Sequence, residues 1–440
     1  MSTLNVDKVD PSTGTALELG TSGDTITVPT GAGLTVVDEV KTNKVSPATG
    51  TAFALGDSGD TFTVPSGATI VNSGTATGFG ITAANFRPNA QPFIYNANMA
   101  VTQRAATTSG FTGNGYPCMD RWRVQGANYG TFTFSQDTSV PDNVSVKHSY
   151  KMDCTTADAS YGASDHFTWQ QRIEGNNFGA LKYGTSDAEA TTVSFWVKSN
   201  LTGDFLCYLY GADNDRFCCK LFSISTTNTW EQIFVNFPGD TTGAINADNG
   251  YGLSIGFGLG FGSDFTSGTL ATTWAAWVDA NWAVGMTNNL SSSTSNDFYI
   301  TGVQMEVGTF TSASDMPIFQ SESYEANLAR CQRYYFDCNP GRVTAAALAS
   351  GAYTTSTNIQ GAIQFPVAMR DNPTMYEVGG SGYWAAEKDT YDIFDDITIY
   401  QPSLTRSGFN GSGNVSATGN DACLVRYRNT SARLAFDAEL

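Results

Sequence analysis

The N-terminal part of the chain contains a direct repeat with a period of 36 residues. Residues 8–32 recur without a gap as residues 44–68, and 18 of the 25 aligned positions are identical. The identical positions include turn-forming residues, such as Pro29 and its counterpart Pro65. Self-similarity at a fixed period indicates that copies of one small unit stack along the chain. Such stacking builds an elongated shaft and argues against an enzyme active site in this part of the protein.

Each repeat unit is predicted to form short β-strands. Residues 25–28 read Thr-Ile-Thr-Val, which alternates polar and apolar side chains with the two-residue period of a strand that has one buried face. Large apolar side chains are too few for a unit of about 36 residues to bury enough surface to fold alone. Other chains would most simply supply the missing core, so we expect residues 1–80 to form an oligomeric stem, with three chains as the first expectation. A disordered linker rich in Gly, Ser and Thr is the alternative.

Composition places the rest of the chain among all-β proteins. Only 15% of the 440 residues are charged, aromatic residues reach 12%, and Gly, Ser, Thr and Asn are abundant. This mixture suits antiparallel sandwiches with many turns and polar exposed strands. The net charge of −18 makes nucleic acid and anionic membranes poor partners, because both are themselves negatively charged. A chain of this length is expected to hold two or three domains.

No targeting segment, membrane span or metal site is predicted. Residues 1–10 are polar and no apolar core follows them, so we expect no signal peptide. No run approaches the roughly 20 apolar residues of a membrane helix. The eight cysteines form no CxxC pair, and with two histidines in the chain a zinc site is not expected. We expect the cysteines to be reduced and buried, and we expect no cofactor. The oxygens of Asp and Asn in turns suit a structural calcium ion, but no ligand spacing in the sequence specifies one.

A neck rich in Gly, Ala and Asn, at residues 81–91, precedes a change in the character of the sequence. Beyond it, runs of aromatic and β-branched residues recur at a regular spacing, separated by Asn, Gly and Asp turns. Strands of this length and spacing indicate an antiparallel β-sandwich. The clearest predicted strands are 131–134, 192–197, 205–210, 232–237 and 298–303.

One predicted strand has a glycine face. From Tyr251 the sequence reads YGLSIGFGLGFG. Because side chains alternate along a strand, one face carries the large apolar residues Leu253, Ile255, Phe257, Leu259 and Phe261. The other face carries the glycines Gly256, Gly258, Gly260 and Gly262. A bare glycine face weakens a strand, so we expect something to lie close against it: first an aromatic ring of the same chain, with a neighbouring subunit or a sugar as alternatives. The spacing resembles GxGxxG, but no helix is predicted after it, which argues against phosphate binding.

Five aromatic residues are candidates for sugar binding. Trp274, Trp277 and Trp282 cluster in the segment TWAAWVDANW, beside Asp and Asn. In lectin-like sites an exposed ring stacks on the face of a pyranose, and neighbouring polar groups bind its hydroxyls. Tyr383 and Trp384 are the further candidates, in the C-terminal part. The alternative for each of these rings is a place in the hydrophobic core.

Four stretches are the most recognisable text of the chain: NMAVTQRA (98–105), SFWVKSNLTGDF (194–205), FYITGVQMEVGTFTS (298–312) and YEANLARCQRYYFD (324–337). Together they resemble a domain found in tail-fibre proteins of bacteriophages, notably marine ones. The resemblance covers about residues 92–337 and implies a jelly roll similar to carbohydrate-binding modules. Residues 338–440 resemble the tip domain that follows in such fibres, through GAIQFPVAMRDNPTM (361–375) and ARLAFDAEL (432–440). The family shares no agreed sugar-binding motif, so no binding residue is carried over from it.

These observations predict an all-β chain with five segments. They are a repeat stem or virion anchor at 1–80, a neck at 81–91, a jelly-roll sandwich at 92–320, a linking helix at 321–337 and a small β-sandwich tip at 338–440. The helix is predicted from a stripe at helical spacing formed by Tyr324, Leu328, Cys331 and Tyr335. A last strand packed into a core is predicted from the alternating Leu434, Phe436 and Ala438.

Catalysis is not predicted. A glycosidase needs two carboxylates about 5 to 10 Å apart. Close pairs such as Asp213 with Asp215, or Asp395 with Asp396, are more typical of turns. A Ser/His/Asp triad has little support either, since His166 fits a hydrogen-bonded strand residue better than a catalytic base.

The sequence therefore predicts a virion fibre protein, a tail fibre made in the host cytoplasm. The repeats are expected to form a homotrimeric stem that attaches to other tail or portal-proximal proteins, and the globular modules to bind a host-surface polysaccharide. Three copies would turn weak sugar contacts into useful avidity. No nucleic acid and no membrane insertion are expected. The alternatives are a purely structural neck, head or baseplate fibre, a polysaccharide depolymerase, and a cellular sugar-binding protein, which the lack of a secretion signal disfavours.

Overall fold

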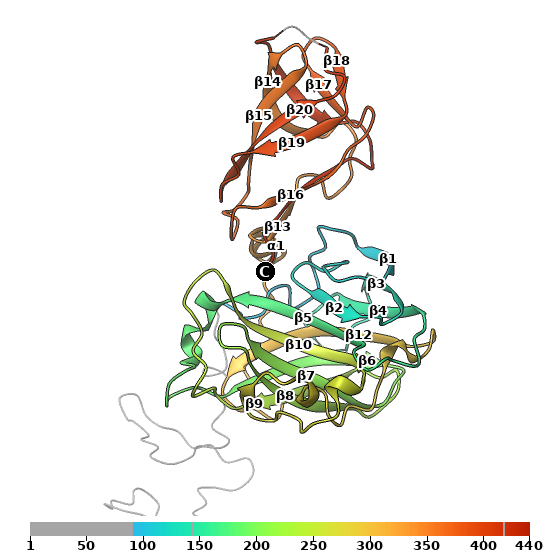
Figure 1. Cartoon of the computed structure of the whole chain (residues 1–440), viewed down its shortest axis with the longest axis vertical. Coiled ribbons are helices and arrows are strands. Elements are labelled where there is room, and N and C mark those ends of the chain that lie inside the picture. Colours follow the sequence, from blue (N-terminus) through green and yellow to red (C-terminus); the bar gives the residue numbers. More distant parts are fainter. Residues whose placement is uncertain (1–90, 143, 417–418) are drawn as a thin grey trace, which may run out of the picture. The chain divides into compact units, whose positions relative to one another are not determined.

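The structure is a computed structural model that describes residues 91–142, 144–416 and 419–440. The two repeats and most of the neck, with the oligomeric stem predicted for residues 1–80, lie outside the described residues. The described part belongs to one compact unit of antiparallel strands with one α-helix and four short 3-10 helices (Figure 1). This architecture confirms the predicted all-β fold. The predicted domain boundaries stay a prediction.

Two six-stranded antiparallel sheets form the central β-sandwich. The chain alternates between them in the manner of a jelly roll, so that strands distant in sequence become neighbours. The first sheet consists, in spatial order, of β1 (Thr107–Phe111), β3 (Thr131–Asp137), β4 (Ser149–Thr156), β12 (Asp297–Val307), β6 (Thr191–Ser199) and β9 (Glu231–Phe237). The second consists of β11 (Ala275–Ala276), β8 (Arg216–Ile224), β7 (Gly203–Gly211), β10 (Tyr251–Phe261), β5 (His166–Glu174) and β2 (Arg123–Ala127).

The core of the sandwich lies between the two sheets. The five strands predicted most clearly from the sequence are confirmed as β3, β6, β7, β9 and β12. Alternate residues of these strands point inward, such as Phe132 and Phe134 of β3, and both are fully buried. Trp122 stacks on Trp169 of β5 with ring centroids 3.9 Å apart. Burial of each large apolar side chain contributes about 1.5–3 kcal/mol, which makes this aromatic core the main source of stability.

The C-terminal part contains helix α1 (Tyr324–Gln332) and two further antiparallel sheets. The smaller sheet consists of β13 (Tyr335–Asp337), β22 (Arg433–Asp437) and β16 (Thr374–Val378). The larger consists, in spatial order, of β18 (Tyr391–Phe394), β17 (Trp384–Glu387), β21 (Ala422–Tyr427), β14 (Ala347–Thr355), β15 (Asn358–Gln364), β20 (Arg406–Ser412) and β19 (Asp396–Tyr400). The predicted last strand is confirmed as β22, where Leu434 and Phe436 are fully buried in a second core.

Helix α1, predicted near residues 322–337, buries partly different residues from those expected. Ser323 caps its N-terminus by accepting a hydrogen bond from the Ala326 amide (3.3 Å). The buried positions are Asn327 and Cys331, whereas Tyr324, expected on the buried stripe, is 53% exposed. Asn327 faces inward because its side-chain oxygen accepts a hydrogen bond from the amide of Asn96 (3.1 Å). A polar pair therefore sets the orientation of this helix. The apolar periodicity predicted the burial of Cys331 correctly, and Tyr335 is also buried but lies in β13, after the helix has ended.

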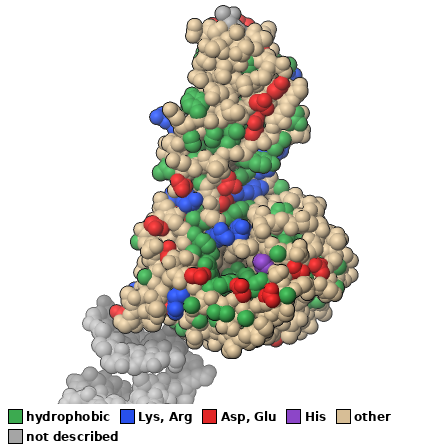
Figure 2. Space-filling model, viewed as in Figure 1, with side chains coloured by type: hydrophobic (Ala, Val, Ile, Leu, Met, Phe, Trp, Pro, Cys, Tyr) green, Lys and Arg blue, Asp and Glu red, His purple; other side chains and the backbone are tan. Residues whose placement is uncertain are grey.

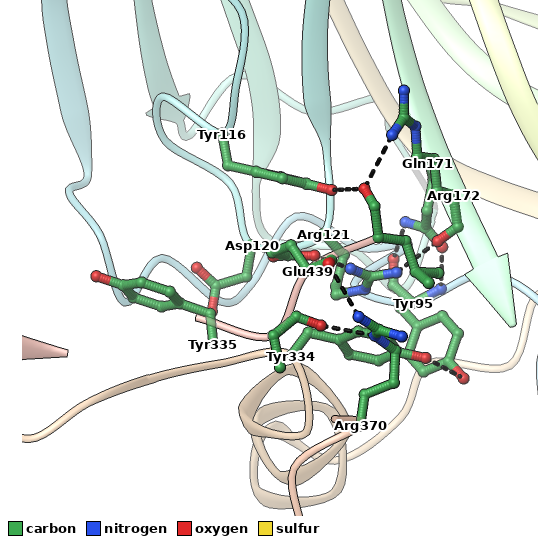
Figure 3. A network of polar contacts seen from close by, with 12 residues as sticks. Tyr95, Tyr116, Asp120, Arg121, Gln171, Arg172, Tyr334, Tyr335, Arg370 and Glu439 are labelled. Carbon is green, nitrogen blue, oxygen red and sulfur yellow. Dashed lines mark hydrogen bonds and ion pairs between the residues drawn. The ribbon is translucent and has the colours of Figure 1, made fainter. Parts of the chain in front are cut away.

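A buried polar network holds the segment after β22 against the central sandwich (Figure 3). The fully buried Arg121 forms an ion pair with Glu439 and donates a hydrogen bond to the backbone oxygen of Arg172. The guanidinium carbon of Arg121 lies 3.4 Å from the ring centroid of Tyr334, whose hydroxyl donates to Glu174. Charged groups tolerate burial when they are paired and hydrogen-bonded, and here Arg121 is paired with Glu439 and Glu174 with Arg333.

The cysteines and the helices can be compared with the sequence predictions in the part of the chain that the structure describes. All eight cysteines lie in it, none forms a disulfide, and seven are buried. Burial raises the pKa of thiols such as Cys118, to about 12, so they remain protonated and unreactive at neutral pH. No helix between residues 91 and 440 that is described has the length and apolar character needed to cross a membrane.

Candidate functional site

The outer face of the second sheet carries the candidate site. Register makes Gln170 of β5, Gly256 of β10 and Tyr208 of β7 direct neighbours across three strands. Directly opposed residues of antiparallel strands point to the same side, and here that side faces away from the main core. A Cβ atom placed on Gly256 would lie only 2.1 Å from the Tyr208 ring. The prediction that an aromatic ring of the same chain fills the glycine face is therefore confirmed.

A β-bulge changes the direction of the last residue of β10. The pairing of β10 with β5 shifts between Gly258 and Gly260. The extra residue turns Phe261 to the outer face, where its ring packs against Gly258 and lies 4.8 Å from the Trp282 ring. The prediction that Phe261 shares the core face with Leu253 is wrong, because simple alternation does not allow for a bulge.

The segment between β10 and η4 (Leu290–Ser292) covers one part of this outer face. Phe265, Trp282 and Ala283 from the segment form a small hydrophobic cluster with Tyr208 and Phe217 of the sheet. This second apolar layer fixes Trp282, which is only 5% exposed. The Trp277 ring lies at the edge of this cluster. Beyond Trp277, the outer face of the second sheet is not covered by the segment and forms a cleft.

The open part is a cleft of about 400 Å³ with an aromatic floor. The ring centroids of Trp277 and Tyr210 lie 5.3 Å apart, and those of Tyr210 and Tyr251 lie 6.1 Å apart. The Arg172 guanidinium continues this row, 4.9 Å from the centre of the Tyr251 ring. The cleft is lined by Gln125, His166, Gln170, Arg172, Tyr208, Tyr210, Asp215, Tyr251, Phe265, Trp277, Asp279 and Trp282.

Carboxylates lie at the Trp277 end of the cleft. The Tyr210 hydroxyl donates to Asp215 (2.9 Å), and the Trp277 ring nitrogen donates to Asp279 (2.6 Å). Burial, together with the neighbouring Asp215, raises the pKa of Tyr210 to about 12, so the phenol remains a hydrogen-bond donor at neutral pH. These bonds hold the aromatic rings in place and leave the free carboxylate lone pairs available to ligand hydroxyls.

Amide and guanidinium groups lie at the opposite end, on β2 and β5. The Gln125 side-chain oxygen accepts hydrogen bonds from Gln170 (2.7 Å), Arg123 (2.5 Å) and Arg172 (3.3 Å). Figure 2 shows basic, acidic and apolar side chains together on one face of the molecule. The cleft thus combines an aromatic floor with polar groups of both kinds at its ends, the usual composition of a small-molecule or sugar site.

The five sequence candidates fall in three different environments. Trp277 and Trp282 both line the cleft. Trp274 lies outside it, where its ring nitrogen donates to the Pro238 carbonyl (2.7 Å). Trp384 is fully buried in the C-terminal core and has no surface to offer a ligand, because its ring packs on Tyr427. Its neighbour Tyr383 is half-buried in the C-terminal part. Of the five candidates, Trp277 and Trp282 are therefore the two that line the cleft together.

The cleft residues that the sequence did not single out come from ordinary strand alternation. Tyr208 and Tyr210 alternate in β7, and Gln170 and Arg172 alternate in β5. Residues two apart in a strand share a face, so each pair could have been assigned to one side. Which side faces the core, and which strands are neighbours, could not be read from these segments alone. His166, expected as a hydrogen-bonded strand residue, begins β5 with a ring nitrogen 3.3 Å from the Ser164 carbonyl oxygen.

A second hollow differs from the cleft in its aromatic lining. It has a volume of about 260 Å³ and is lined mainly by apolar side chains such as Phe93, Met305 and Phe319, with no Trp or Tyr ring among its lining residues. Among the described residues, no group of three or more His, Cys, Asp or Glu side chains is placed to hold a metal ion.

Comparison with known proteins places the chain near two kinds of solved structure. No family model matches the sequence, and no curated protein is similar enough to count as a relative. The enzymatically active domain of tailspike protein 4 from bacteriophage CBA120 is 12% identical; the match covers 49% of this chain and 21% of that one, with a TM-score of 0.26. A family 11 carbohydrate-binding module from Clostridium thermocellum, in complex with a mixed-linked tetrasaccharide, is 11% identical over 47% of this chain and 99% of the module, with a TM-score of 0.25.

A further solved structure, of a protein from Bacteroides thetaiotaomicron, is also similar, with 11% identity over 50% of this chain and 100% of that chain and a TM-score of 0.29. At these identities and scores, the matches do not assign a ligand or a residue role to this chain. The proposal of function therefore rests on the geometry of the cleft.

Proposed function

We propose that this chain is a non-enzymatic virion fibre protein that binds a polysaccharide of the host surface through the cleft on the second sheet. The observation that carries the proposal is the continuous floor of Trp277, Tyr210 and Tyr251. The Tyr210 ring is inclined by 83° to that of Trp277 and by 50° to that of Tyr251, so the row offers ring faces and ring edges in turn. A ring that presents its face stacks on the apolar face of a pyranose, and the neighbouring edges add apolar contact. The carboxylates at one end and the amide groups at the other bind hydroxyls and orient the polymer.

The direction of the cleft supports a polymer over a single sugar. The cleft runs across the strands, from β2 and β5 over β10 and β7 to the turn before β8. With strands about 4.8 Å apart, four such steps span roughly 19 Å. That length accommodates several linked sugar units, which can reach both polar ends at once.

Binding of purified polysaccharides to the full chain tests this proposal. Titration calorimetry on polysaccharides selected from an array should give saturable binding, and Trp277→Ala should weaken it by roughly tenfold or more through the loss of the stacking face. Trp230→Ala is the matched control, since Trp230 is half-buried directly before β9 of the other sheet, where its ring contacts that of Tyr299. Thermal unfolding of each variant checks that the fold is retained. No binding of any polysaccharide, or equal loss in both variants, would contradict the proposal.

The virion role rests on different observations. The 36-residue repeat supports a stem, and residues 92–440 resemble the modules of phage tail fibres. We propose a homotrimer that attaches to other tail or portal-proximal proteins through its N-terminal region and lies on the assembled particle. Purified protein should block adsorption of the phage to its host. Presence on particles without any adsorption block would favour the purely structural fibre instead.

Hydrolysis is not part of the proposal, although two carboxylates line the cleft. Asp215 and Asp279 are both held by aromatic donors, Tyr210 and Trp277. A glycosidase uses one carboxyl group as a proton donor and the other as base or nucleophile. We expect no release of reducing sugar from any bound polysaccharide. Release that disappears in Asp215→Asn or Asp279→Asn would establish the depolymerase alternative.

A further inference from the structure

The β2–β5 end of the cleft holds more hydrogen-bond donors than acceptors. Arg123, Arg172 and Gln170 all donate to the single side-chain oxygen of Gln125, at 2.5, 3.3 and 2.7 Å. A carbonyl oxygen has two lone pairs, so it cannot satisfy three donors fully. The Nε atom of Arg172 is buried and has no hydrogen-bond partner in the structure. Buried donors without acceptors are unfavourable, and a bound acceptor group would relieve both deficits.

The two guanidinium groups also lack side-chain counter-ions. Other buried or half-buried arginines of the described chain are paired: Arg121 with Glu439, Arg216 with Asp240 and Arg333 with Glu174. Within the described residues, neither Arg123 nor Arg172 forms an ion pair with an Asp or Glu side chain. Burial and the nearby charge of Arg172 lower the pKa of Arg123, as expected for like charges held together.

Backbone contacts do not remove this excess of positive charge. One Arg172 amine donates to the Leu440 backbone oxygen (3.0 Å), which also lies 3.5 Å from the Tyr116 hydroxyl. Counting even a full negative charge at Leu440 leaves one of the two guanidinium charges unbalanced. Asp215 and Asp279 stand at the other end of the cleft, beyond β7, which is two strand steps from β5 and three from β2, or roughly 10 and 14 Å along the sheet. Charges further apart than the Debye length of about 8 Å are largely screened, so these aspartates do little to offset the arginines.

Resting on the proposed sugar-binding function, we propose that the cleft selects an anionic polysaccharide, with a carboxylate or sulfate substituent bound by Arg123 and Arg172. The planar guanidinium fork matches both groups and forms charge-assisted hydrogen bonds with them. The sugar ring that carries the substituent stacks on Tyr251, and the polymer continues over Tyr210 towards Trp277. The polymer is thereby oriented, with its charged group at the β2–β5 end and hydroxyls facing the aspartates.

Paired polymers that differ only in charge test this assignment. Binding of the full chain is measured by calorimetry to polygalacturonate and to the same polymer after reduction of its carboxyl groups to alcohols. A sulfated galactan and its desulfated form provide the second pair, which distinguishes a carboxylate source from a sulfate source. At least one charged polymer should bind about tenfold or more tightly than its neutral form, and added salt should reduce the difference.

Arg123→Gln should reduce that preference by about tenfold, measured as the ratio of the affinities for the charged and neutral forms of one polymer. Arg428→Gln is the control, because Arg428 is an exposed arginine of the C-terminal sandwich and the variant removes the same net charge. Equal binding of charged and neutral forms, or binding only to neutral polysaccharides, would overturn the charge assignment and leave the proposed sugar-binding function intact. A chain that binds no polysaccharide of either kind would overturn both.

Discussion

Arg121 and Glu439 form an ion pair although they are 318 residues apart in the sequence. The Arg121 side chain is completely inaccessible to solvent, and the Glu439 side chain is only 6% exposed. Arg121 precedes β2 in the central sandwich, whereas Glu439 follows β22 in the C-terminal part (Figure 3). The stability of the two parts is therefore linked by a buried charge pair as well as by the chain that connects them.

Glu439→Gln is expected to lower the free energy of unfolding by about 3 kcal/mol, because it leaves the buried Arg121 charge without its counter-ion. Chemical denaturation of the full chain measures the change. Glu325→Gln, an exposed carboxylate in the first turn of α1, should change stability by only a few tenths of a kcal/mol. Replacement of the whole pair, Arg121→Met with Glu439→Leu, should recover most of the loss, and equal stability of Glu439→Gln and wild type would contradict this account.

Asp120 is expected to make stability fall as the pH rises from about 4 to about 6. Burial raises the pKa of Asp120 from 3.8 to about 6, despite the attraction of Arg104. A folded-state pKa above the unfolded one favours the protonated form in the native protein, so the contribution is complete below pH 4 and is lost above pH 6. The difference amounts to at most about 3 kcal/mol. Denaturation between pH 4 and 7 should show a slope that Asp120→Asn removes, and an unchanged slope in that variant would count against it.

Tyr210 is expected to act in the cleft through its ring more than through its hydroxyl. Tyr210→Phe keeps the stacking surface and loses only the hydrogen bond to Asp215, so the affinity for a bound polysaccharide should fall less than about threefold. Tyr210→Ala removes the central ring of the floor, and the affinity should fall by about tenfold or more. Calorimetry on the two variants compares them directly, and a larger loss in the phenylalanine variant would show that the hydroxyl dominates.

Gly256→Ala is expected to destabilise the sheet by about 1–3 kcal/mol, since the new methyl group would overlap the Tyr208 ring and force it to move. The matched control is Gly179→Ala in η1 (Gly175–Leu181), where an added Cβ meets nothing within 4 Å. Thermal unfolding of the two variants gives the comparison. A Gly256 variant as stable as the control would mean that the Tyr208 ring relaxes freely.

The N-terminal repeats are expected to hold the chain as a trimer. Light scattering on the full chain should give three times the monomer mass of 46.9 kDa. Deletion of residues 1–80 should yield smaller species in which both β-sandwiches keep their unfolding transitions. A monomeric full chain would refute the trimer, and loss of both transitions on deletion would refute the modular organisation.

Strand alternation predicted much of the fold because side chains in a sheet change sides at every residue. It assigned Leu253, Ile255 and Phe257 of β10 correctly to the core face, and it required a filler for Gly256. It failed at Phe261, because a bulge depends on the pairing of β10 with β5, and that pairing is a contact between distant parts of the chain.

The candidate site was predictable only in part for a related reason. Trp277 and Trp282 stood out as a local cluster, whereas Arg172 and Tyr251 reach the cleft only through the order of strands in the sheet. Trp384 has a similar polar neighbourhood in the sequence but lies in the C-terminal core. The local sequence around an aromatic residue does not show whether its ring lies in a core or lines a binding site. The order of strands in the sheets decides between these two positions.

The ring of Tyr208 occupies the volume that a side chain at position 256 would fill. Because residue 256 is a glycine, the Tyr208 ring can lie close against β10, and its position sets the depth of the cleft. Gly256 itself does not line the cleft. Selection that alters which polymers fit could therefore act on the glycines of β10 as readily as on the aromatic residues of the floor. Variation at Gly256 among related chains would then signal a change in the shape of the cleft, even where every residue that contacts the ligand is the same.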